Sequence, residues 1–356
     1  MRVVLSASAR FGGLWADDLI EVTSDVSRLD SSGRWAVVLP YDGDPVCARF
    51  ANWSTAPGTD AIGRWRGPVG MAWDTSLDQA AYRSAVESIR LSIAAGDVYQ
   101  ANICRVMSAE LPDATASDVA ALSMLLAAGN PSPYGGFLRL PDHGVHIATA
   151  SPELFLAVSR DGTRRLAQSG PIKGTARLAS GLTDKDAAEN VMIVDLVRND
   201  LSIVSLPGSV TVPRLLEVQE HPGLAHFVSY VQGELKPAVG WTELLAASFP
   251  PGSVTGAPKL AALRLISELE PASRSFYCGA IGWVDADTGE AELAVAIRTF
   301  WVEGDRLCFG TGAGITWGSD AEAEWRETEL KAARLTEVAA RAWPDDDAAA
   351  LHTVAP

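Results

Sequence analysis

The chain has few basic residues and few cysteines for its length of 356 residues. It contains 29 Lys and Arg against 44 Asp and Glu, which gives a formal net charge of -15 at pH 7. Since nucleic-acid surfaces need clustered basic side chains, this acidity argues against a nucleic-acid partner. The cysteines form no CxxC pair and no zinc spacing with histidine, so we interpret them as reduced core thiols: Cys47, Cys104, Cys278 and Cys308.

Long apolar runs and export signals are also missing. The N-terminal stretch MRVVLSASARFGG has no long apolar run after its basic start. No segment reaches the roughly 18 apolar residues of a membrane-spanning helix. We therefore expect a cytoplasmic protein with no membrane partner. GxGxxG, Walker A and GxSxG sequences are absent, so the usual fingerprints of dinucleotide, nucleotide and serine-nucleophile sites do not apply.

The hydrophobic content of 47% is enough for a sizeable core, and its periodicity predicts both helices and strands. Helical patterns cover residues 78–96, 116–128, a segment beginning near 183, 258–271 and about 319–341. Two of these helices begin with a capping-box pattern, Thr183 with Asp186 and Ser319 with Glu322. Short strands fill most of the rest, and residues 278–315 predict an antiparallel meander. The sequence thus predicts an α+β fold, with large antiparallel β-sheets forming a sandwich-like core and helices packed outside.

Two helical segments each carry a pair of acids. Glu324, Glu327 and Lys331 fall on one helical face at i, i+3 and i+7. Asp186 and Glu189 are likewise three residues apart, at the border of an apolar helix. Each set has two interpretations: a solvated face with local ion pairs, or carboxylate ligands for a hard cation beside a lysine that reaches an anion. Acids from two helices are well suited to hold Mg²⁺ together with water and substrate oxygens.

Several single positions stand out against their surroundings. The glycine-rich turns at 250–258 and 310–315 can present backbone N–H groups to an anion, although most such turns only reverse the chain. Arg298 ends the apolar run LAVAIR and suits a carboxylate ligand. Glu153 lies in an apolar strand, either buried with the raised pKa of a general acid or at an edge in water. Lys173, in SGPIKGTARL, is either a surface charge or a reactive amine.

Together these motifs resemble those of the chorismate-utilising enzymes, which include component I of anthranilate synthase, component I of aminodeoxychorismate synthase, and the isochorismate and salicylate synthases. The matching segments follow the family's order from about residue 78 to residue 340, and include GDVYQANICR, ASPELF, PIKGTARL, AENVMIVDLVRNDL, FPPGSVTGAPK, YCGAIG, AIRT and GTGAGI. The resemblance implies a chorismate-binding catalytic core over residues 76–342. Residues 1–75 are expected to form a short β-rich segment packed on it, and residues 343–356 a frayed tail.

The resemblance also implies a Mg²⁺ site and a substrate site. The metal ligands fall on Glu189 and Glu327, with Asp186 and Glu324 nearby. Chorismate is a dicarboxylate, and the positions implied in binding it are Gly174, Thr175, Tyr277, Arg298, Gly312, Gly314 and Lys331. Further positions match family residues that act in the reaction: Glu153, which would protonate the departing C4 hydroxyl, His226, Gln100 and Lys173.

Two positions indicate which reaction to expect. At Gln100 the isochorismate and salicylate synthases have a lysine that activates water, so water addition is disfavoured here. The PIKGT sequence at Lys173 is similar to that of aminodeoxychorismate synthases, whereas anthranilate synthases have PIAGT. The resemblance implies that the Lys173 amine attacks C2 and expels the C4 hydroxyl, after which ammonia attacks C4 and releases the lysine.

The expected activity is that of aminodeoxychorismate synthase component I, the Mg²⁺-dependent amination of chorismate to 4-amino-4-deoxychorismate, in folate supply or an aminobenzoate-derived natural-product pathway. The chain contains no glutaminase sequence, so the ammonia is expected from a separate glutamine amidotransferase subunit. Two alternatives stay open. One is anthranilate synthase component I, and the other, from a different class, is a non-catalytic chorismate-binding subunit.

Overall fold

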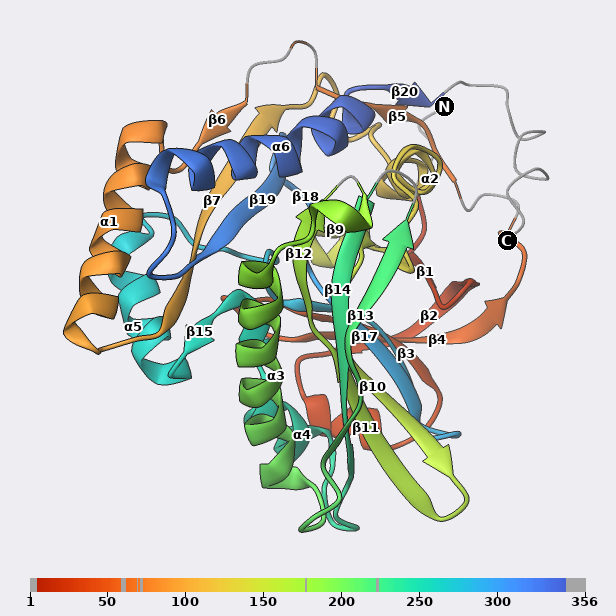
Figure 1. Cartoon of the computed structure of the whole chain (residues 1–356). Helices are drawn as coiled ribbons and strands as arrows, with labels where there is room; N and C mark the ends of the chain where they lie inside the picture. The colour runs from red at the N-terminus through yellow and green to blue at the C-terminus, as the bar shows by residue number, and fades with distance from the viewer. Residues whose placement is uncertain are drawn as a thin grey trace.

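The computed structural model in Figure 1 describes residues 5–58, 62–68, 70, 73–176, 178–221 and 224–343. Apart from Trp343, the predicted tail at 343–356 lies outside these residues. The described part of the chain forms one large antiparallel sheet and six α-helices, which confirms the predicted fold class. None of the described helices combines the length and the apolarity needed to span a membrane.

The sheet has 18 strands in the described residues and curls so that its two halves face each other. In the first half the strands pair in the order β7 (Gln100–Glu110), β19 (Arg306–Ile315), β18 (Thr299–Glu303), β9 (Val145–Ser151), β8 (Tyr134–Leu140) and β1 (Ser8–Phe11). In the second half the order is β3 (Arg34–Leu39), β16 (Ala280–Asp285), β17 (Glu290–Val295), β10 (Leu154–Asp161), β11 (Arg164–Gly170), β14 (Leu224–Glu234) and β13 (Thr211–His221). β12 (Ile172–Ala176) also pairs with β14.

The remaining strands connect or extend this sheet, except for two short strands that form a small sheet of their own. β2 (Leu14–Thr23) and β4 (Val46–Ser54) pair with each other and link β1 to β3. β6 (Asp74–Thr75) and β15 (Gly256–Ala257) extend β7, while β5 (Trp65–Arg66) pairs with β20 (Ala342–Trp343). Strands β1 to β4 therefore join the two halves through β1–β8 and β3–β16 pairing. The predicted domain boundaries stay a prediction.

The main core lies between the two halves, where Trp35 and Leu138 are fully buried. The helices are α1 (Gln79–Ala95), α2 (Val119–Gly129), α3 (Asp184–Val204), α4 (Trp241–Ser248), α5 (Lys259–Leu269) and α6 (Ala321–Ala339). α2 and α6 cover the outer face of the first half, around Phe300, whose neighbour Trp301 points into the main core. α1 and α5 pack beside β7, and α3 runs along β12 and β14, as Figure 1 shows.

The helix caps confirm one prediction and correct another. Asp186 Oδ2 accepts a hydrogen bond from the Thr183 amide at 2.9 Å, and the Thr183 hydroxyl accepts one from the Asp186 amide at 3.2 Å, as a capping box requires. The predicted box at Ser319 is wrong because α6 begins one residue later. Asp320 caps that helix by accepting from the Ala323 amide, and the Ser319 hydroxyl accepts from a residue of the preceding turn.

The predicted meander over 278–315 is also wrong. The segment forms two hairpins, β16–β17 and β18–β19, and the chain crosses between the two halves of the sheet in residues 296–298. β17 continues to β10, whereas β18 pairs with β9. Residues 310–315, predicted as a turn, are the end of strand β19 and pair directly with β7. The short helix α4 was not predicted.

Candidate active site

Lys173 lies on β12 and turns its side chain into the molecule. Its Nζ donates a hydrogen bond to the backbone carbonyl of Ser253 at 3.2 Å, in the short 3-10 turn Gly252–Val254. A Cβ built on Gly314 of β19 would lie 3.4 Å from the same Nζ. Lys173 is half-buried. It is therefore a fixed, inward-directed amine rather than a freely solvated charge.

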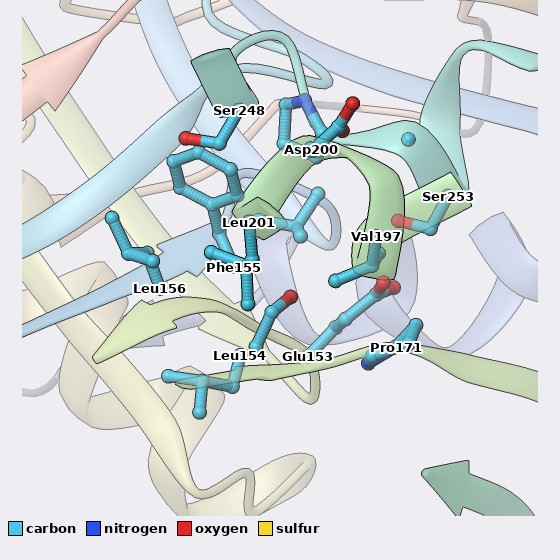
Figure 2. Close-up of a pocket in the computed structure, with 14 residues that line it drawn as sticks. Glu153, Leu154, Phe155, Leu156, Pro171, Val197, Asp200, Leu201, Ser248 and Ser253 are labelled. Atoms are coloured by element: carbon cyan, nitrogen blue, oxygen red, sulfur yellow. The ribbon is translucent and has the colours of Figure 1, made fainter. Parts of the chain in front are cut away.

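Glu153 lies between β9 and β10 and is only 4% exposed, so the alternative of an edge glutamate in water is wrong. Burial raises the pKa of Glu153 to about 6, while a hydrogen bond with the Ser253 hydroxyl and the charges of Lys173 and Arg298 act in the opposite direction. In Figure 2 the carboxyl end of Glu153 points toward Ser253, beside a cavity of ≈ 20 Å³ that Asp200 lines from α3. Glu153 has the burial and the pKa of a general acid.

A buried ion pair fixes the loop that carries Ser253. Lys259, the first residue of α5, donates to Asp200 Oδ2 at 2.7 Å and to the carbonyls of Ser248 and Pro250 at 3.2 and 3.1 Å. Burial raises the pKa of Asp200, and Lys259 counters this shift. No sequence pattern indicated Ser253, Asp200 or Lys259, because their roles depend on contacts between segments far apart in the chain.

The predicted acids of α3 and α6 come together. Burial raises the pKa of Glu189 and of Glu324, and the nearby charge of Glu327 raises both further. Lys331, whose Nζ lies 2.7 Å from Glu327 Oε1, holds the pKa of Glu327 below its usual range. Repulsion among acids from two helices is what a bound divalent cation relieves. Within the described ranges no three His, Cys, Asp or Glu side chains form a metal cage alone, so water and ligand oxygens would complete the coordination.

Lys185 already places a positive charge among these acids. Its Nζ lies 3.7 Å from Glu189 Oε1 and 3.7 Å from Glu324 Oε1, so that it contacts both helices. Three of the chain's five lysines, Lys173, Lys185 and Lys331, thus surround the acid cluster. The Lys185 ammonium thus lies where a cation is attracted by acids of both helices. No pattern in the sequence had indicated Lys185.

Asp186 serves the helix end rather than the open part of the cluster, because its Oδ2 is held by Thr183. Gly174 has a φ of 73°, and a Cβ there would lie 2.9 Å from the Asp186 Cβ, so only glycine fits. The Gly174 carbonyl lies 2.8 Å from Nδ1 of His226, which is buried on β14. Thr175 follows on β12, and its side chain lies outside what the structure describes.

Tyr277 and Arg298, the predicted carboxylate-binding pair, lie on neighbouring turns. The Cys278 amide donates to the Ala296 carbonyl at 3.0 Å, which brings the turns together. Arg298 adopts a left-handed φ of 53°, a conformation that costs energy for an arginine and recurs at functional sites. Burial lowers the pKa of Arg298, and the charge of Glu153 partly restores it. The guanidinium is therefore within electrostatic reach of the Glu153 carboxyl.

Gln100 is the first residue of β7 and is fully buried. Among the described residues neither its Nε2 nor its Oε1 has a hydrogen-bond partner, although a buried unpaired amide costs about 1–3 kcal/mol. A Cβ on Gly314 would lie 2.5 Å from this Nε2, so the side chains of Gln100 and Lys173 both lie close to Gly314. The carbonyl of Gly312, two residues earlier, accepts a hydrogen bond from Lys331 at 3.0 Å. The site thus combines an acid cluster, three lysines and an arginine with a buried amide that the described residues leave unpaired.

Comparison with known proteins agrees with this geometry. Residues 66–337 match the family of chorismate binding enzymes. The chain belongs to this family. It is 36% identical over 278 residues to aminodeoxychorismate synthase component 1 of Salmonella typhimurium, an alignment that covers 74% of the chain and 58% of that protein. It is also 38% identical over 307 residues to anthranilate synthase component 1 of Streptomyces coelicolor, covering 83% of the chain and 57% of the relative. The alignments thus span less than two thirds of these family members.

Solved structures of the family share the fold. Anthranilate synthase component I of Streptococcus pneumoniae superposes with a TM-score of 0.72 at 24% identity, over 94% of this chain and 91% of that one. The menaquinone-specific isochorismate synthase of Escherichia coli gives a TM-score of 0.77 at 17% identity, over 95% and 89% of the two chains. At these identities the likeness establishes the architecture alone. It does not separate amination from hydration.

Proposed function

We propose that this chain is an aminodeoxychorismate synthase component I, which aminates chorismate at C4. The observation that carries the proposal is the position of Lys173, hydrogen-bonded to Ser253 and within electrostatic reach of Glu153 and the acid cluster. An amine fixed near a carboxyl whose pKa burial raises to about 6 suits a substitution that needs a nucleophile and a proton donor together.

The proposed reaction has two balanced steps. The Lys173 amine forms a bond to C2 of chorismate while the C4–oxygen bond breaks, and the Glu153 proton goes to the departing hydroxyl, which leaves as water. Ammonia then forms a bond to C4, the bond between C2 and Lys173 breaks, and a proton from the new ammonium returns to Glu153. The ring product keeps its enolpyruvyl group and is 4-amino-4-deoxychorismate.

The remaining residues hold the dicarboxylate substrate. Glu189 and Glu327 would hold Mg²⁺, which would supply a positive charge for the ring carboxylate, with Glu324 and Asp186 beside these two ligands. Arg298 and Tyr277 bind the enolpyruvyl carboxylate. The positions assigned to the ring and its carboxylate are Lys331, Gly312, Gly314, Gly174, Thr175 and His226.

The ammonia is proposed to come from a glutamine amidotransferase partner. The name component 1, which several relatives carry, implies a second component in those proteins. With such a partner the chain would supply 4-amino-4-deoxychorismate in the cytoplasm, either for p-aminobenzoate and folate or for an aminobenzoate-derived natural product. Anthranilate synthase component I is the second candidate, because relatives with that name are as similar in sequence.

The two candidates differ in products that can be identified directly. Purified chain, chorismate, MgCl₂ and an ammonium salt are incubated together, and the products are analysed by chromatography with mass spectrometry. We expect 4-amino-4-deoxychorismate without pyruvate. Anthranilate with an equal amount of pyruvate would instead establish the second candidate. Binding of chorismate without turnover, even with an amidotransferase present, would mark a non-catalytic subunit.

A further inference from the structure

Lys185 occupies an unfavourable place for a basic residue. It is the second residue of α3, in the first turn, where the helix dipole disfavours positive charge. Its side chain is 50% exposed, yet its Nζ reaches Glu189 on the same helix and Glu324 on α6, each at 3.7 Å. Both acids are much more buried than the lysine. The contacts with two helices account for the position of Lys185, whereas helix formation does not.

Lys185 is also held more loosely than the other lysine on this side of the cluster. Lys331 lies 2.7 Å from Glu327 and donates to the Gly312 carbonyl at 3.0 Å, so two short contacts fix it. Lys185 has two long contacts and an open route to solvent. Of these two lysines, Lys185 therefore needs less free energy to move from the acid cluster into solvent.

We propose that Lys185 is an internal counter-ion, which neutralises the acid cluster while no divalent cation is bound and moves into solvent when one binds. This inference rests on the proposed function, which makes Glu189 a metal ligand. An arriving cation meets the ammonium at contact distance from Glu189, and two positive charges at that separation repel strongly in a partly buried site. Lys185 therefore competes with the metal and sets the affinity of the site for Mg²⁺.

The test is calorimetric titration of MgCl₂ into the full chain without substrate, at fixed pH and ionic strength. Lys185→Met removes the competing charge, and Lys185→Arg keeps it. Lys236→Met is the matched control, because Lys236 is a half-buried lysine outside the acid cluster, whose Nζ donates to the Ile203 carbonyl near the other end of α3. Since Lys185 is half exposed, we expect Lys185→Met to bind Mg²⁺ about five- to tenfold more tightly than wild type, with both other variants near wild type.

Each outcome decides the inference. Unchanged or weaker Mg²⁺ binding by Lys185→Met overturns it, and so does an equal gain in Lys236→Met, since net charge alone would then explain the effect. If the wild-type chain binds no Mg²⁺ at all, the metal site of the proposed function fails as well.

A measurement on the wild-type chain removes any dependence on how the variants fold. Reductive methylation followed by peptide mass spectrometry reports how accessible each of the five lysines is. Saturating Mg²⁺ should speed labelling of Lys185 and leave Lys236 unchanged. Equal labelling of Lys185 with and without Mg²⁺ contradicts its displacement.

Discussion

The Lys173 ammonium and the Ser253 carbonyl are hydrogen-bonded at 3.2 Å, and the Ser253 hydroxyl bonds the carboxyl of Glu153. One residue of a short turn therefore spaces the proposed nucleophile from the proposed general acid. C2 and C4 of chorismate belong to one ring, so a fixed spacing lets both groups act on a single bound substrate.

Glu153→Gln is expected to abolish amination while stabilising the fold. Its pKa of about 6 lies above the ordinary 4.5, so the folded chain holds the proton more tightly than the unfolded chain. Between these values folding takes up a proton, and stability falls as pH rises. Above pH 6 the ionised Glu153 carboxylate lowers the stability of the wild-type fold by about 2 kcal/mol. The neutral glutamine of the variant does not have this cost.

Urea unfolding and steady-state rates check this prediction together. The stability gap between Glu153→Gln and wild type should be wider at pH 8 than at pH 5, and the variant's turnover about 10²- to 10⁴-fold lower. Equal stabilities at pH 8 would show that the carboxyl is not buried and perturbed as described.

Gln100→Met should also lower the activity and raise the stability of the fold. The buried amide has no partner in the part of the chain that the structure describes, so replacing it with an apolar side chain of similar length removes a desolvation cost of about 1–3 kcal/mol. If the amide serves the substrate, kcat/KM for chorismate falls at least about tenfold in the same variant. Wild-type kinetics together with a stability gain would mean that the amide has no part in binding.

Gly314→Ala tests how closely Lys173 and Gln100 approach the glycine strand. The new Cβ would lie 2.5 Å from Gln100 Nε2 and 3.4 Å from Lys173 Nζ, so one of them must shift. We expect a loss of activity of about tenfold or more with the fold retained, because a displacement of about 1 Å is costly at a reacting centre. Gly318→Ala is the control, since a Cβ there meets nothing within 4 Å. Equal activities of the two variants would remove Gly314 from the site.

Local signals allowed the sequence to predict five of the six described α-helices and several of their ends. The Thr183–Asp186 box spans only three residues and depends on no distant contact, so its pattern was sufficient. The crossing at 296–298 was not predictable in this way. β17 pairs with β10, and β18 pairs with β9, each about 140 to 150 residues earlier in the chain. The alternation of apolar residues does not reveal which earlier strand is the partner.

The residues of the candidate site likewise fall into those that the sequence could predict and those that only the packed structure reveals. Side chains that belong to family motifs, such as Lys173 and Glu189, were placed by resemblance, and the structure brings them into one region. Ser253 contacts Lys173 through its backbone carbonyl. Every residue type has this group, so the sequence does not indicate the contact. In the sequence Lys185 resembles an ordinary helix-surface lysine, and only its contact with Glu324 of α6 distinguishes it. Contacts of this kind are properties of the packed chain alone.

The most direct test of the account is the product of Lys173→Ala with chorismate, MgCl₂ and ammonia. The covalent route predicts that formation of 4-amino-4-deoxychorismate falls by about a hundredfold or more, because no amine remains to bond C2. Lys236→Ala serves as the matched control and should form the product at the wild-type rate. Undiminished 4-amino-4-deoxychorismate from the Lys173→Ala variant would contradict the role of Lys173 as the nucleophile.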